Sequence, residues 1–200
     1  MNADLLLAFV LFSVATMFTP GPNNVMLLAS GLNFGLRRTL PHMAGVAIGF
    51  AVLVAATGFG LGGLFTAYPV LQTLLKYAGA VYLAWLAFLI ARAAPADPGQ
   101  ADQRRPMSFV AAVLFQWVNV KGWVIAVGAA TAYAALASYP WNVMTQTGVL
   151  FAVGVLSSLT WALFGTLLQS LVKSPRAVRV FNVTMAILLL ASLYPVLRQP

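Results

Sequence analysis

The sequence predicts an all-α integral membrane protein of six transmembrane helices, arranged as two inverted three-helix repeats in which helices 1 and 4 are interrupted. Three observations predict this fold: an apolar composition, six long apolar stretches, and a polar linker that separates three of them from the other three. Hydrophobic side chains make up 62% of the 200 residues and charged ones 7%, with three acidic residues and no cysteine. Soluble domains usually carry about 25% charged residues. A soluble single-domain enzyme and a disordered chain are therefore both excluded.

Each apolar stretch is long enough to cross a bilayer core, which takes about 20 residues of helix. The stretches are continuously apolar rather than alternating, which favours helices over the strands of a barrel. The first, fourth and fifth exceed the usual length, so we expect tilt or a break in each. The predicted spans are residues 5–30, 41–64, 70–91, 108–135, 142–171 and 177–197.

Basic residues near the span ends predict the orientation, because Lys and Arg there stay in the cytoplasm. Eight of the eleven lie in the first, third and fifth connections: Arg37, Arg38, Arg92, Arg104, Arg105, Lys173, Arg176 and Arg179. The N-terminus and the second and fourth connections contain none. We therefore expect both termini outside. Residues 92–107 form a cytoplasmic linker between a first repeat of residues 1–91 and a second repeat of residues 108–200.

Two spans contain residues that interrupt a helix. The first contains Thr19-Pro20-Gly21-Pro22-Asn23-Asn24, whose prolines remove backbone donors. The fourth contains Gln116-Trp117-Val118-Asn119-Val120-Lys121-Gly122, a polar cluster with one charge and a glycine. The first span of each half is thus interrupted. Inverted-repeat transporters are built in this way and bind their substrates at broken helices near the midplane.

A break creates helix N-termini inside the membrane, and such ends attract anions. We expect Pro22 in the first turn of one half-helix, with Thr19 or Asn23 as its cap, and Asn119 as the cap of the other. Lys121 adds an ammonium in mid-span, where a charge costs at least about 2.5–3.5 kcal/mol on insertion scales. The candidate substrate-binding residues are Pro20, Gly21, Pro22, Asn23, Asn24, Gln116, Asn119 and Lys121. The structural alternatives are a kink at the prolines and an interhelical hydrogen-bond clamp at Asn119 and Lys121.

Three titratable residues are candidates for proton coupling: His42, Asp4 and Lys76. His42 is the only histidine and lies one residue inside the second span, so an interfacial position is its alternative. Lys76 has an anchor at the outer interface as its alternative, and Asp4 is the sole acid near a span. No predicted span contains a carboxylate, a metal-spaced cluster or an ATP motif. We therefore expect no enzyme activity, metal or cofactor.

Other residues are interpreted as structural. Small residues four apart, Gly45/Gly49 and Gly58/Gly62, allow helices to approach closely. Packing within the protomer is favoured over a homodimer seam. Ser157, Ser158 and Thr160 are expected to hydrogen-bond their own helix. The scattered basic residues form no continuous basic face, so a lipid bilayer rather than nucleic acid is the expected partner.

The run from Thr19 to Asn24, followed by Gly31-x-x-x-Gly35 and Gly45-x-x-x-Gly49, resembles the opening of the LysE/RhtB family of amino-acid exporters. Residues 76–85, Lys-Tyr-Ala-Gly-Ala-Val-Tyr-Leu-Ala-Trp, resemble the third-span signature of that family. Most relatives have Asn-Pro-Lys in the fourth span, whereas Val120 replaces the proline here. The Asn-Val-Lys form, with residues 106–109 ahead and 161–163 behind, is similar to the cysteine/O-acetylserine exporter branch. The resemblance implies six helices, a bacterial inner-membrane location and proton-driven efflux.

The leading hypothesis is a secondary exporter of small neutral amino acids, whose carboxylate binds at the half-helix N-termini near Lys121. Two alternatives belong to other classes. A passive small-solute channel needs the same breaks but no coupling. A non-transporting membrane partner protein, held by its small-residue seams, tolerates replacement of Lys121.

Overall fold

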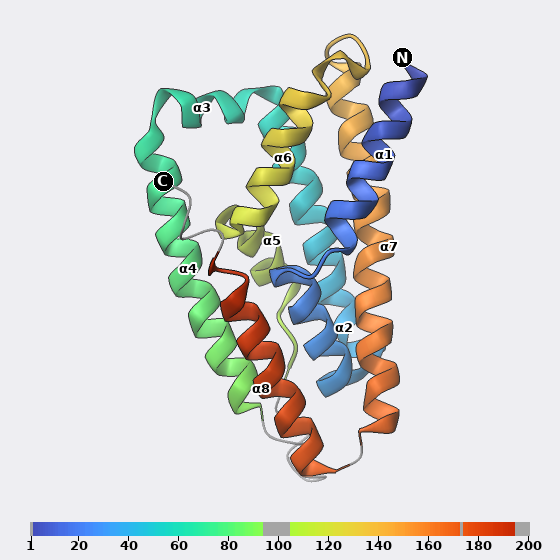
Figure 1. The fold of residues 1–200 in the computed structure, drawn as a ribbon, viewed down its shortest axis with the longest axis vertical. Coiled ribbons are helices and arrows are strands. Elements are labelled where there is room, and N and C mark those ends of the chain that lie inside the picture. The colour runs from blue at the N-terminus through green and yellow to red at the C-terminus, as the bar shows by residue number, and fades with distance from the viewer. Residues whose placement is uncertain (1, 94–104, 173, 195–200) are drawn as a thin grey trace.

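The computed structural model describes residues 2–93, 105–172 and 174–194, and the regular structure of these residues is helical. Most helices run along the long axis of the molecule, whereas α3 crosses one end (Figure 1). Residues 94–104 of the predicted linker lie outside the described residues, as do Lys173 and Arg198. The elements are α1 (Ala3–Phe18), α2 (Pro22–Ala56), η1 (Thr57–Leu61), α3 (Gly62–Ala67), α4 (Pro69–Arg92), α5 (Phe109–Val118), α6 (Val120–Ala132), η2 (Ala134–Leu136), α7 (Trp141–Leu171) and α8 (Pro175–Ala191).

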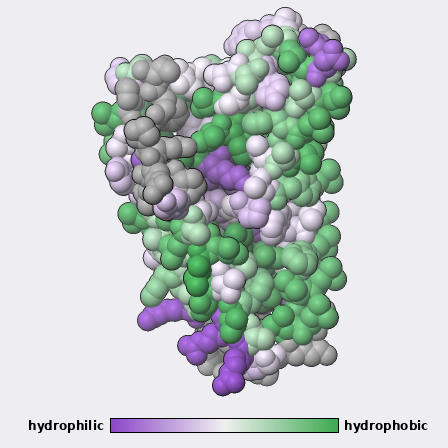
Figure 2. Space-filling model, viewed as in Figure 1, coloured by the Kyte–Doolittle hydropathy of each residue, from purple (hydrophilic) through white to green (hydrophobic). Residues whose placement is uncertain are grey.

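Three helical segments of the described residues are long and apolar enough to cross a membrane: Pro22–Leu61, Thr73–Arg92 and Trp141–Gln169. The bent pair α5 and α6 adds a fourth if its two parts form one span, and α1 is a shorter apolar helix. The long flank of the molecule is largely apolar, and hydrophilic side chains gather at the end where α8 begins (Figure 2). This distribution is that of a helical membrane protein.

The 35-residue helix α2 contains a chain reversal at Gly35, whose φ of 74° and ψ of 168° are not helical. Ser30 Oγ and His42 Nδ1 lie 3.0 Å apart across it, whereas twelve residues of straight helix would separate them by about 18 Å. A positive φ favours glycine, which has no Cβ. The sequence predicted a longer connection here and a span that begins at residue 41. That boundary is wrong, because the helix resumes directly after Gly35 and Pro41 lies inside it.

The predicted break in the first span is present, since α1 ends at Phe18 and α2 begins at Pro22 in its first turn. The predicted side-chain cap is wrong. Gly21 occupies the N-cap position of α2, in extended backbone, and has no side chain to cap with. Thr19 instead ends α1, where its hydroxyl donates to the Ala15 carbonyl.

The predicted break in the fourth span is also present, because α5 and α6 meet at Asn119 with a bend of 66°. Asn119 holds the N-cap position of α6, but its side chain makes no capping hydrogen bond. That prediction is wrong because Asn119 Nδ2 turns back toward Gln116 Oε1, 3.5 Å away. Both breaks lie midway along the long axis (Figure 1). Four helix ends therefore lie near the middle of the molecule's length rather than at its two ends.

Glycines bring α2 close to its neighbours. A Cβ on Gly45 would collide with the Phe109 carbonyl oxygen of α5, and one on Gly49 would lie 2.7 Å from Val113 Cα. The prediction that these glycines pack within the protomer is confirmed. A Cβ on Gly165 of α7 would collide with the Leu28 carbonyl oxygen of α2. The two parts of α2 are thereby held against α5 and α7, where they form one wall of the site.

Candidate substrate site

Lys121 connects the two breaks. It is the second residue of α6, and its ammonium donates to the carbonyl oxygens of Thr19 at 2.9 Å and Pro20 at 3.4 Å. These carbonyls follow the C-terminal end of α1, the negative end of its dipole. Gly21 leaves the room for this contact, because a Cβ there would lie 2.8 Å from both Cδ and Nζ of Lys121.

Asn23 and Gln116 form a second direct connection between the breaks. Asn23 Nδ2 donates to Gln116 Oε1 at 2.9 Å, and Gln116 Nε2 donates to Asn23 Oδ1 at 3.1 Å. Gln116 Nε2 also donates to the Ala112 carbonyl at 2.9 Å. The Gln116 side chain is fully buried. The pair is therefore a reciprocal amide contact that joins α2 to α5.

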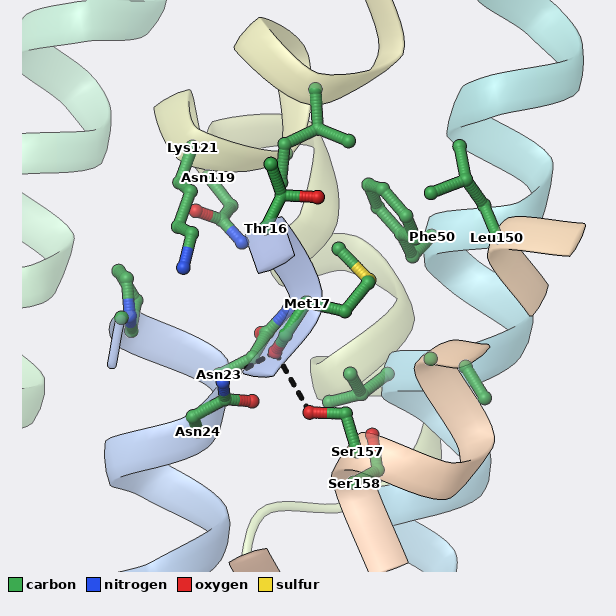
Figure 3. Close-up of a pocket in the computed structure, with 17 residues that line it drawn as sticks. Thr16, Met17, Asn23, Asn24, Phe50, Asn119, Lys121, Leu150, Ser157 and Ser158 are labelled. Atoms are coloured by element: carbon green, nitrogen blue, oxygen red, sulfur yellow. Dashed lines mark hydrogen bonds between the residues drawn. The ribbon is translucent and has the colours of Figure 1, made fainter. Parts of the chain in front are cut away.

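The exposed carbonyls at the end of α1 receive further donors. Asn24 Nδ2 donates to Met17 O at 2.7 Å and to Thr19 O at 2.9 Å. Ser157 Oγ of α7 donates to the same Met17 oxygen at 2.7 Å (Figure 3). Ser157 was expected to bond its own helix, and that prediction is wrong because the break offers it a carbonyl lacking a helical donor. Thr160 does bond its own helix, at Leu156 O.

A cavity of about 40 Å³ lies between the two breaks, α7 and the second part of α2 (Figure 3). Six of the predicted site residues line it: Gly21, Pro22, Asn23, Asn24, Asn119 and Lys121. Pro20 and Gln116 do not belong to this lining but contact residues that do. A water needs at least about 10–15 Å³ on this scale. The cavity therefore has room for roughly three waters, which is less volume than an amino acid needs.

Other lining residues were missed from the sequence. Thr16, Val46, Phe50, Leu150 and Ser158 come from α1, α2 and α7 and complete the wall of the cavity. Most are apolar residues in apolar helices, so their side chains carry no local signal that separates a cavity wall from a lipid-facing surface. Gly154 and Ser157, small residues on one face of α7, are the only clue of this kind that the sequence offered.

A second cavity, of about 240 Å³, adjoins the first. It shares four lining residues with it, Gly21, Pro22, Asn119 and Lys121, and Leu83 and Leu193 also line it. Asn119 is therefore placed where the two cavities adjoin. Its Oδ1 is buried and has no hydrogen-bond partner among the described residues. Leaving a buried acceptor unpaired costs about 1–3 kcal/mol. The site thus presents one ammonium donor, from Lys121, and one unpaired acceptor.

Two helix N-termini also face the first cavity, of about 40 Å³, which we call the central cavity. The first N–H to bond inside α2 is that of Val25, to Gly21 O, and in α6 it is that of Trp123, to Asn119 O. The N–H groups that precede them have no acceptor within their helices. Each of these ends carries a partial positive charge, and Lys121 adds an ammonium beside them.

The three candidates for proton coupling lie elsewhere. His42 is 1% exposed and lines a separate cavity. Asp4 is in the first turn of α1, and Lys76 of α4 lies 5.8 Å from the centroid of the Tyr77 ring. Within the described ranges, no group of three His, Cys, Asp or Glu side chains is placed to hold a metal ion.

Interrupted membrane helices that meet around a buried polar cavity are typical of membrane transporters. The chain belongs to the LysE type translocator family, whose model matches residues 14–192. It is 34% identical over 194 residues to the cysteine/O-acetylserine efflux protein of Escherichia coli O139:H28, covering 95% of this chain and 96% of that protein. The proteins of that name from Escherichia coli strain K12 and Shigella sonnei are each 34% identical over 193 residues, covering 94% of this chain and 95% of theirs. No solved structure matches. The family expected from the sequence motifs is confirmed.

Proposed function

We propose that this chain is a secondary exporter of small neutral amino acids across the bacterial inner membrane, with cysteine and O-acetylserine as its first candidate substrates. Its relatives are named for the efflux of those two compounds. The observation that carries the proposal is the cavity between the two breaks, where a cation and an unpaired acceptor come together in the interior.

The chemistry of this cavity is complementary to a zwitterion. The substrate carboxylate binds the Lys121 ammonium and the N-terminal ends of α2 and α6, and the α-ammonium donates to Asn119 Oδ1. Lys121 now donates to two peptide carbonyls. A carboxylate is the stronger acceptor, because hydrogen bonds between ionised groups are roughly twice as strong as neutral ones. Phe50 and Leu150 line the same cavity and are placed to contact the substrate side chain.

Substrate binding is thereby coupled to movement. When a carboxylate takes the Lys121 ammonium, the carbonyls of Thr19 and Pro20 lose a donor, and the contact between α1 and α6 weakens. The Asn23–Gln116 pair is the second contact that opens when the halves rock about the site, as in other inverted-repeat transporters. The small cavity is the closed form of this cycle.

The proposed architecture has six spans in two inverted halves, residues 1–91 and 108–200. The spans are α1 with the part of α2 before Gly35, the rest of α2, α4, α5 with α6, α7, and α8. The chain directions in Figure 1 support this assignment, since successive spans run in opposite directions along the long axis. Both termini lie outside, and residues 92–107 face the cytoplasm.

Export is driven by the proton gradient, with His42 as the proton-carrying residue. Of the three candidates His42 is the one in the interior, where its Nε2 is buried without a partner among the described residues. Imidazole is also the side chain whose charge changes between about pH 5 and 8.

The test is uptake of labelled O-acetyl-L-serine, L-cysteine and a panel of amino acids into everted membrane vesicles or proteoliposomes with an acidic interior. We expect accumulation above equilibrium that a protonophore abolishes. A passive channel would equilibrate the solute without accumulating it. The His42→Gln variant should retain exchange of labelled for unlabelled substrate and lose accumulation. Uptake no faster than in protein-free liposomes for every amino acid tested would contradict the proposal.

A further inference from the structure

A third cavity, of about 570 Å³, lies where α4 ends and α5 begins. Its volume is within the range of roughly 300–1,000 Å³ that is usual for small-molecule sites. We propose that it is a vestibule in which the carboxylate of an α-amino acid docks on Arg92 and Arg105 before the substrate reaches the central cavity. This proposal rests on the proposed function, because it assumes an amino acid that enters from the end of the molecule holding these arginines. The polar and charged side chains of the vestibule are Ser30, Asn33, His42, Tyr82, Arg92 and Arg105.

The first part of α2 contributes to both cavities in a fixed order. Its first residues, Pro22, Asn23 and Asn24, line the central cavity. The residues that follow along the same helix, from Met26 to Asn33, line the vestibule. The helix therefore leads from one cavity directly to the other.

Two other helical segments connect the same two cavities in the reverse order along the chain. After the reversal of α2, His42 lines the vestibule, and Phe50, two turns later, lines the central cavity. Along α5, Ala111 lines the vestibule, and Asn119 at the end of the helix lines the central cavity. These three segments therefore place the vestibule next to the central cavity. Gln116, between Ala111 and Asn119, places its contact with Asn23 at the boundary.

The charge of the vestibule selects an anion. Arg92 ends α4, with its Cζ 4.5 Å from the centroid of the Phe88 ring, and Arg105 approaches from the chain that leads into α5. Both side chains are exposed. The described residues that line this cavity include no acidic side chain. A planar guanidinium binds a carboxylate through two parallel hydrogen bonds, so two arginines at one cavity favour this group.

A buried atom of His42, the residue proposed above as the proton carrier, is a second sign of a ligand, because the neutral imidazole is free to accept a donor. His42 is 1% exposed, and its Nε2 has no hydrogen-bond partner among the described residues. Its Nδ1 lies 3.0 Å from Ser30 Oγ. When Nδ1–H donates to that oxygen, Nε2 is an acceptor, which suits the α-ammonium of a zwitterion whose carboxylate is held by the arginines. Buried polar atoms are nearly always paired, so Nε2 indicates that a polar group visits this cavity.

The experiment uses the absence of cysteine from the chain. The Ala111→Cys variant carries a single thiol in the vestibule, at a half-buried position with a small side chain. A membrane-impermeant, cationic methanethiosulfonate reagent is applied to everted vesicles, whose outer face is cytoplasmic. We expect O-acetyl-L-serine, which has no thiol to consume the reagent, to slow labelling severalfold. Its methyl ester, which lacks the carboxylate, should give no protection.

The arginines are tested in the same Ala111→Cys background. The pair Arg92→Gln and Arg105→Gln should raise the concentration of O-acetyl-L-serine needed for half-protection about tenfold or more. Arg92→Lys with Arg105→Lys keeps the charge and should recover part of the protection. The matched control is Arg176→Gln with Arg179→Gln, two charges at the start of α8 that lie outside the vestibule lining. This control should protect as the parent does.

The outcomes separate the vestibule from the proposed function. Equal protection by acid and methyl ester, or by the arginine variants and the control, in a preparation that exports O-acetyl-L-serine overturns the vestibule alone. Carboxylate-dependent protection in a preparation that does not export this compound supports the vestibule and contradicts the proposed substrate. Absence of both protection and export overturns both.

Discussion

The ammonium of Lys121 donates a hydrogen bond to the carbonyl oxygen of Thr19, 2.9 Å away in space and 102 residues earlier in the chain. The contact joins the start of α6 to the end of α1, so it holds the two helix breaks together. A substrate that draws the ammonium away changes this contact directly. Under the proposed function, ligand recognition and the packing of the breaks therefore depend on one side chain.

Lys121→Met should insert and fold but lose carboxylate recognition. Removal of a charged hydrogen bond costs about 1.5–3 kcal/mol, which corresponds to about 10- to 100-fold in apparent affinity. The measurement is the concentration dependence of O-acetyl-L-serine uptake in proteoliposomes. Lys121→Arg, which keeps the charge but changes its shape, should recover part of the activity.

Arg176→Met is the matched control for this prediction, because Arg176 of α8 is not part of the described central lining. We expect it to transport at the parent rate. If Lys121→Met also transports at the parent rate, Lys121 is a structural clamp. The binding role would then pass to Asn23, Asn24 and Asn119.

Gly21→Ala tests the close approach of the two breaks. The added Cβ would lie 2.8 Å from Cδ and Nζ of Lys121, so the lysine must move from the Thr19 carbonyl. We expect a lower rate of export with normal insertion. Gly148→Ala in α7, where a Cβ meets no atom within 4 Å, is the control and should export normally. Equal rates for both variants would show that the tight contact at Gly21 has no part in transport.

The Asn23–Gln116 contact is tested by a double-mutant cycle. The variants Asn23→Ala and Gln116→Ala, alone and together, are compared by thermal unfolding in detergent. Two hydrogen bonds connect the side chains, so we expect a coupling energy of about 0.5–3 kcal/mol. Additive effects of the two substitutions would show that the contact does not contribute to the stability of this closed structure.

The orientation is tested with reporters fused after residue 200. Eight of eleven basic residues lie in three alternate connections, so a reporter that is active only outside the cytoplasm should work there. The same reporter inserted within residues 94–104 should be inactive. The reverse pattern would place both termini in the cytoplasm and invert the direction of the proposed vestibule.

The positions of the two helix breaks can be predicted from the amino-acid sequence alone. Prolines remove backbone donors, and glycine or a charge weakens a helix in lipid, so these effects act within a few residues of chain and can be recognised locally. Pro22 accordingly begins α2, and the polar cluster around Asn119 divides α5 from α6. The apolar stretches that contain Thr73–Arg92 and Trp141–Gln169 were recognisable for the same reason, since bilayer thickness sets their length.

Which groups these breaks bring together depends on the packing of helices that are far apart in the chain. Lys121 meets Thr19, Asn23 meets Gln116, and Ser157 meets Met17 across 102, 93 and 140 residues of chain. Such contacts depend on how whole helices pack, and no local pattern encodes them. The wall formed by α7 was missed for a related reason. An apolar residue in a membrane helix has the same chemistry whether it faces lipid or a cavity, and only packing decides between the two.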